Sequence, residues 1–121
     1  MRMNISQLVH SIKKHPDYDR VGMILCHNGV VRGTSRDGRN VSGLKISVDH
    51  GKLNQVIESH KKMPGIVEIR VEIAENQRLR VGDDVMLLVV AGDVREHVIS
   101  ALTATLNAVK TTVTQKTEFF V

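Results

Sequence analysis

Aromatic residues are scarce in this chain of 121 residues, where Phe, Tyr and Trp together make up 2% and Trp is absent. Proteins that hold single-stranded nucleic acid without sequence preference stack the bases on aromatic side chains, so this class is disfavoured. The core must be aliphatic instead. A single cysteine, Cys26, excludes an internal disulfide. Because Cys26 follows an apolar run in MILCH and has no cation beside it in the sequence, we expect it to be a small, buried, structural side chain.

Several other signals are missing. No apolar run is long enough to span a bilayer and no signal-type hydrophobic region opens the chain, so we expect a cytoplasmic protein with no membrane partner. No P-loop, dinucleotide fingerprint or Gly-x-Ser-x-Gly motif occurs. The six histidines lack metal-site spacing, and we therefore predict no metal and no cofactor. No run of five basic residues marks a nucleic-acid tail, so we expect no nucleic-acid partner. The net charge of +4 suits other anionic partners, such as phosphorylated metabolites or an acidic protein.

Length and hydrophobic periodicity predict one α+β domain over residues 1–121, with a mainly antiparallel sheet and two to three helices. Helical spacing of apolar residues predicts helices near residues 5–12, 52–62 and 94–109. Runs of β-forming residues predict strands within 20–33, 41–49, 65–73, 85–91 and 113–121.

Four local features carry more specific expectations. The strands within 20–33 and 41–49 could pair as a hairpin with a long loop, and Gly29 indicates a bulge or a close backbone approach. Alternation in 65–73 predicts one buried face and one wet face, the latter carrying Glu68. Asp93 and Glu96 have the spacing of a capping box at the start of the long helix.

Basic residues mark the ends of several predicted elements. Lys110 closes the long helix and Lys116 opens the last strand, with no acidic residue between them. Arg32 ends a strand just before a Gly-bearing turn, which carries Arg36 and Arg39. Arg95 lies in the first turn of the long helix, where free backbone N–H groups favour an anion. Each of these residues could be a solvated charge, or several could together form an anion site.

The order of GVVRG, RVGDDVMLLVVAG, VREHVISALTATLNAVK and KTEFF resembles the large, catalytic subunit of molybdopterin synthase, the MoaE family, over roughly residues 20–120. The resemblance implies an α/β hammerhead-like fold and a homodimer. It further implies that each subunit holds a small ubiquitin-like sulfur-carrier subunit with a Gly-Gly C-terminus, giving a heterotetramer. Sulfur would pass from the thiocarboxylated C-terminus of that partner to cyclic pyranopterin monophosphate and form molybdopterin, a step of molybdenum cofactor biosynthesis.

The same resemblance assigns roles to four residues. Lys110 and Lys116 match the family's catalytic lysines, while Arg32 and Arg95 match its substrate-binding arginines. Both anions of the reaction, a phosphate and a thiocarboxylate, suit such side chains, and a lysine can protonate an oxygen leaving group.

The chain differs from the family pattern at a few positions. Val94 takes the place of a histidine, Ala74 and Glu75 that of a His-Arg pair, and His27 that of a phenylalanine. The loop between the two lysines is also shorter. These differences keep a second interpretation open: a binding or regulatory protein of the same fold that has lost synthase activity.

Overall fold

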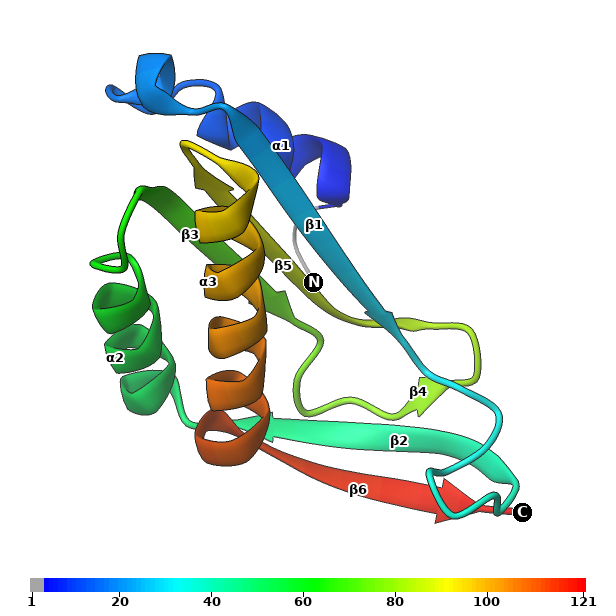
Figure 1. The fold of residues 1–121 in the computed structure, drawn as a ribbon. Helices are drawn as coiled ribbons and strands as arrows, with labels where there is room; N and C mark the ends of the chain where they lie inside the picture. The colour runs from blue at the N-terminus through cyan, green and yellow to red at the C-terminus, as the bar shows by residue number, and fades with distance from the viewer. Residues whose placement is uncertain (1–3) are drawn as a thin grey trace.

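Two three-stranded antiparallel sheets and three helices form the fold, seen in a computed structural model that describes residues 4–121 (Figure 1). The helices are α1 (Ile5–Ile12), α2 (His50–His60) and α3 (Arg95–Ala108). A short 3₁₀ turn covers Tyr18–Arg20, and a π-helical turn, Val109–Val113, extends α3. The strands are β1 (Met23–Val30), β2 (Val41–Val48), β3 (Ile66–Ile73), β4 (Leu79–Arg80), β5 (Asp84–Gly92) and β6 (Thr114–Phe120). The predicted α+β class with a mainly antiparallel sheet is confirmed.

The first sheet has the strand order β1-β5-β3 and is covered on both faces. Side chains of β5 alternate between the two faces. Leu87, Val89 and Ala91 pack with α1, whereas Leu88 and Val90 pack with α3. This double cover explains why the sequence of β5 is a continuous apolar run and not an alternating one.

The second sheet has the order β4-β2-β6 and lies across one end of the first, below it in Figure 1. Leu44 and Ile46 of β2 form a core cluster with Leu79 of β4. A neighbouring cluster joins the end of α3 to the first sheet, where Val109 and Val113 of the π-helical turn pack with Leu53 and Met86. At the junction of the two sheets, β2 and β6 therefore pack from the second sheet, and the end of α3 packs from one side.

The predicted hairpin between the first two strands is wrong. β1 pairs with β5 over its whole length, and β2 pairs with β4 and β6, so residues 31–40 cross from one sheet to the other. Strand-forming composition alone does not choose a partner. Here β1 pairs with β5, whose residues 86–92 are buried. The expectation for Gly29 is confirmed, because the register of β1 shifts between Gly29 and Val30.

Two further expectations are corrected by tertiary packing. Glu68 is not on a wet face: it is buried, and its carboxylate lies 3.3 Å from the Lys61 Nζ. Cys26 is exposed, because β1 is an edge strand and the cover from α1 ends near Ile24. Its thiol is still partly covered, and this desolvation raises the pKa of Cys26.

The capping box at the start of α3 does not form. The helix begins one residue later than predicted, with Val94 at the N-cap position, so Glu96 is not at the third helical position. The Asp93 carboxylate instead accepts hydrogen bonds from the backbone N–H of Val94 and from the His97 ring, at 2.6 and 2.7 Å. The hydrogen bond from His97 is the main reason why the pKa of Asp93 is lowered.

Candidate active-site cavity

A cavity of about 360 Å³ opens where the two sheets and the end of α3 meet. Its cationic side chains come from three separate segments: Arg36 from the loop after β1, Lys110 from the π-helical turn and Lys116 from β6. Among the described residues that line it, none is acidic. The lining residues are His27, Gly29, Val30, Arg36, Leu44, Ile46, Val85, Met86, Lys110, Thr114 and Lys116.

Lys110 reaches this cavity because α3 does not end as a regular α-helix. The π-helical turn is anchored by Val109 and Val113, both buried, while Lys110 between them is exposed. The Thr112 hydroxyl donates to the Ala108 carbonyl at 2.6 Å and so satisfies one carbonyl at the end of the helix. Wider turns of this type are often found at functional sites. The sequence predicted Lys110 at a helix end but could not reveal the π-helical geometry.

Lys116 reaches the same cavity through strand alternation. Thr114 and Lys116 of β6 point to one face, together with Leu44 and Ile46 of β2, and Lys116 pairs in register with Ile46. The Lys116 Nζ lies 4.0 Å from the Glu118 carboxylate, at the outer limit of an ion pair. An exposed pair at this distance contributes little free energy, so Lys116 keeps most of its capacity for an external anion.

The structure also places in the cavity two residues that the sequence did not single out as site residues, His27 and Arg36. Arg36 was visible only as one basic residue of a Gly-bearing turn. His27 could have been found from the alternation of β1, because residues 23, 25 and 27 share one face and Met23 and Leu25 pack on the α3 side. Burial and, second, the positive charge of Lys110 lower the pKa of His27. His27 is therefore mainly neutral at neutral pH.

The two arginines predicted to bind substrate lie outside the lining of this cavity. The Arg32 Nε donates to the Thr34 carbonyl oxygen at 2.8 Å. Arg95 begins α3 and forms an exposed ion pair with Glu96 at 3.2 Å. Fifteen residues of helix separate Arg95 from Lys110, a rise of roughly 20 Å. Of the four predicted residues, the structure brings together the two lysines, and the arginine that lines the cavity with them is Arg36.

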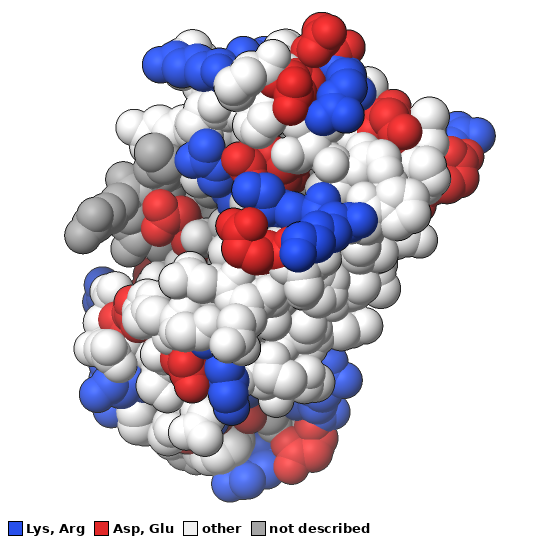
Figure 2. Space-filling view, turned by 90° about the vertical axis from the view of Figure 1, so that its left-hand side faces the viewer, with Lys and Arg blue, Asp and Glu red and all other residues white. Residues whose placement is uncertain are grey.

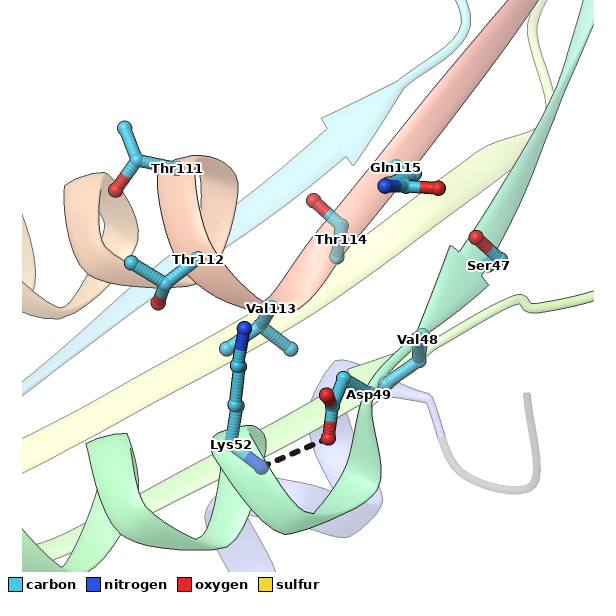
Figure 3. A pocket seen from close by; sticks show the side chains of 9 residues that line it. All are labelled: Ser47, Val48, Asp49, Lys52, Thr111, Thr112, Val113, Thr114 and Gln115. Carbon is cyan, nitrogen blue, oxygen red and sulfur yellow. Dashed lines mark hydrogen bonds between the residues drawn. The ribbon is translucent and has the colours of Figure 1, made fainter.

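A larger hollow of about 560 Å³ lies beside the π-helical turn and the start of α2 (Figure 3). Its side chains are mostly hydroxyls and amides, with Lys52 as its cation. The Asp49 carboxylate caps α2 by accepting the Lys52 backbone N–H at 3.0 Å. The Thr111 and Thr112 hydroxyls donate to helix carbonyls. Asp49, Thr111 and Thr112 are already hydrogen-bonded within the protein, so the hollow offers a ligand fewer free groups than the smaller cavity with its three cations. The two cavities adjoin at Thr114.

Other kinds of site find less support in the structure. Among residues 4–121, no cluster of three His, Cys, Asp or Glu side chains could hold a metal ion. On the face seen in Figure 2, Lys and Arg side chains lie next to Asp and Glu side chains and do not gather in one basic field. No helix in the described part of the chain is long and apolar enough to cross a membrane.

The model of one protein family, described as MoaE protein, matches residues 2–112. The chain belongs to the MoaE family. The resemblance inferred from the sequence is thereby confirmed, and membership supports a role in molybdenum cofactor biosynthesis. No curated protein sequence matches closely enough to count as a relative.

Solved structures of similar fold carry related descriptions. Molybdopterin synthase from Staphylococcus aureus has a TM-score of 0.79 at 19% identity, covering 98% of this chain and 86% of that one. The MoaE protein from Burkholderia ambifaria MC40-6 has a TM-score of 0.75 at 16% identity, covering 98% and 82%. A complex of subunits 1 and 2 of molybdopterin-converting factor from Helicobacter pylori 26695 has a TM-score of 0.69 at 15% identity, covering 98% and 84%. At these identities the likeness shows a common fold, which agrees with the hammerhead-like arrangement expected from the sequence.

Proposed function

We propose that this chain is the large subunit of a molybdopterin synthase. It transfers sulfur from the thiocarboxylated C-terminus of a small ubiquitin-like partner to cyclic pyranopterin monophosphate, and so forms the dithiolene of molybdopterin. The observation that carries this proposal is the cavity that holds Arg36, Lys110 and Lys116 with no acidic side chain among its described lining residues.

The chemistry of the proposed reaction fits this charge distribution. The thiocarboxylate and the substrate phosphate are both anions, and each needs cationic donors within a site that excludes most water. Lys110 extends from a rigid turn anchored by two buried valines, so it is held for contact with the reacting group. Lys116, from β6, and Arg36, from the loop after β1, hold the phosphate. Lys110 can also give a proton to an oxygen leaving group.

The partner subunit is the second part of the proposal. A relative of the same fold is described as part of a complex of two subunits of molybdopterin-converting factor, which supports a small-subunit partner here. Val30 lines the cavity and is exposed. Its apolar side chain offers a contact for an extended C-terminal tail whose carboxyl end reaches the cations.

A homodimer of this chain, giving a heterotetramer with the partner, stays a prediction. The apolar residues near the C-terminal end of the chain are partly covered: Arg78 stacks on the Phe119 ring and Arg39 on the Phe120 ring, at 4.0 and 3.6 Å from the ring centres. Val121 remains exposed, and β6 is an edge strand with one unpaired side. Light scattering of the chain alone and with its partner measures both stoichiometries. The roles of Arg32 and Arg95 in substrate binding likewise stay predictions.

Reconstitution tests the proposal. The purified chain is mixed with a thiocarboxylated small subunit and cyclic pyranopterin monophosphate, and dithiolene formation is measured. The control uses the same small subunit with an ordinary carboxylate end. Product that depends on the thiocarboxylate supports the proposal. Tight binding of both partners without product would instead favour the alternative, a protein of this fold that has lost synthase activity.

A further inference from the structure

His27 brings a titratable imidazole ring into a cavity whose other ionisable side chains are two lysines and an arginine. It lies on the face of β1 that looks toward α3, two residues before Gly29. A Cβ atom at position 29 would stand 3.2 Å from the His27 Nε2, so the glycine leaves this nitrogen uncovered. Among the hydrogen bonds and ion pairs of residues 4–121, none involves the His27 ring. The Nε2 edge is therefore available to a ligand.

The charged side chains that line the cavity together with His27 are all cationic. Lys110 faces it from the π-helical turn, Lys116 from β6 and Arg36 from the loop after β1. The walls formed by β2 and β5 present Leu44, Ile46, Val85 and Met86. Residues 98–109, toward the end of α3, contain no charged side chain. Of the nearby acids, Glu118 lies 4.0 Å from the Lys116 Nζ, and Asp84 accepts a hydrogen bond from Asn28, whose position on β1 alternates with that of His27.

With these neighbours, the protonation state of His27 depends on whether an anion occupies the cavity. In the empty cavity, burial and the Lys110 ammonium both oppose a charged imidazole, and the pKa of His27 is lowered from its ordinary value of 6.5. An anion placed among the same cations would offset the repulsion from Lys110 and would itself attract the imidazolium. Its entry should therefore raise the pKa of His27.

We propose that His27 is a proton-coupled anion ligand of the cavity: its ring takes up a proton from solvent as an oxyanion enters beside Lys110, and then donates a hydrogen bond to that oxyanion. The empty cavity thus avoids a fourth positive charge, and the occupied cavity gains one. The proposal rests on the proposed function for the identity of the natural oxyanion, which is either the phosphate of the small substrate or the carboxyl end of the partner's tail.

Linkage fixes the sign of the expected effect. A ligand whose binding raises the pKa of one group binds more tightly as the pH falls between the free and bound pKa values, approaching about tenfold per pH unit for one proton. Because the free value lies below 6.5, the effect belongs to mildly acidic to neutral solution.

Sulfate is the appropriate first probe, because it resembles phosphate but does not itself titrate near neutral pH. Its affinity is measured by calorimetry from about pH 5 to about pH 8, in two buffers of different ionisation enthalpy, at an ionic strength fixed with chloride. A short peptide with a free Gly-Gly carboxyl end is the second probe. Native protein is compared with His27→Gln, which cannot be protonated, and with His10→Gln, a matched change at an exposed histidine of α1.

We expect native protein and His10→Gln to take up a proton with at least one of the two probes, and His27→Gln to bind that probe with a flat pH dependence. The probe that shows the uptake identifies the source of the natural oxyanion. Equal slopes in His27→Gln and native protein, or no binding of either probe, would overturn the proposal.

Nuclear magnetic resonance gives a second measurement that does not depend on a variant's folding. In free native protein the pKa of His27 should lie below its ordinary value of 6.5, and a saturating probe should shift its titration upward. A His27 titration that the bound probe leaves unchanged would contradict the proposal. Neither readout requires sulfur transfer. A protein that takes up the proton but makes no dithiolene would refute the proposed function alone, whereas an active protein with an unresponsive His27 would refute this inference alone.

Discussion

Thr105→Val should stabilise the protein, which is an unusual expectation for a fully buried position. Thr105 lies on the inner face of α3 with 0% of its surface exposed, and its hydroxyl oxygen has no hydrogen-bond partner among the described residues. Thr103 shows the usual alternative, because its hydroxyl donates to the Ile99 carbonyl one turn earlier, at 3.0 Å. A buried hydroxyl without a partner has lost its bonds to water and gained none in return.

The size of the effect follows from the replacement. Valine has nearly the same shape as threonine and a similar helix propensity, so the change removes the hydroxyl with little repacking. Loss of one unsatisfied buried polar group should raise the free energy of unfolding by about 1 to 2 kcal/mol. For a chain of this size each kcal/mol corresponds to roughly 3 to 6 °C in the thermal midpoint.

Urea unfolding followed by circular dichroism measures this change. Thr103→Val is the matched control, because its hydroxyl is exposed and the substitution should alter stability by less than about 0.5 kcal/mol. A less stable Thr105→Val variant would refute the reasoning, because it would mean that the hydroxyl makes a favourable bond. Since Thr105 does not line the cavity, the variant should also retain sulfur transfer at the native rate.

Two further predictions concern the other end of α3. Gly65 has a φ of +75°, and a Cβ atom there would collide with the side chains of Asp93 and His97. Gly65→Ala should therefore lower the free energy of unfolding in urea by roughly 1 to 3 kcal/mol; an unchanged midpoint would contradict this. Because the His97 hydrogen bond holds the pKa of Asp93 below its ordinary value of 3.8, its stabilisation is present above that value and is lost as the pH falls through the folded pKa. The test measures urea unfolding midpoints over a range of pH. As the pH falls, the midpoint of Asp93→Asn should drop less steeply than that of native protein. Parallel curves would exclude this contribution of Asp93.

Local sequence signals predicted most of the elements but not how they associate. The continuous apolar run of β5 and the helical stripe of α3 each depend on residues close in sequence, so both could be placed before the structure. The pairing of β1 with β5 depends on partners some sixty residues apart. Composition does not encode that choice, and the hairpin expectation therefore failed. The exposure of Cys26 and the burial of Glu68 failed for the same reason, because cover from other elements decides both.

The candidate site shows the same division between local and long-range information. Lys110 and Lys116 were visible because they mark a junction between a helix and a strand, and the structure places both on one cavity. Arg36 and His27 line the same cavity as the two lysines only because residues 31–40 carry the chain from the first sheet to the second. The π-helical turn that presents Lys110 has no signature in the sequence beyond two valines four residues apart.

A single-turnover comparison of native protein with Lys110→Met tests the central claim, that this cavity is where sulfur is transferred. Dithiolene formation is followed with saturating thiocarboxylated partner and cyclic pterin. Loss of one preorganised cationic donor should slow the step about 10² to 10³-fold. Stability should change little, because Lys110 is exposed and forms no ion pair within the described residues. Equal rates in a correctly folded Lys110→Met variant would contradict the account and move the reaction away from this cavity.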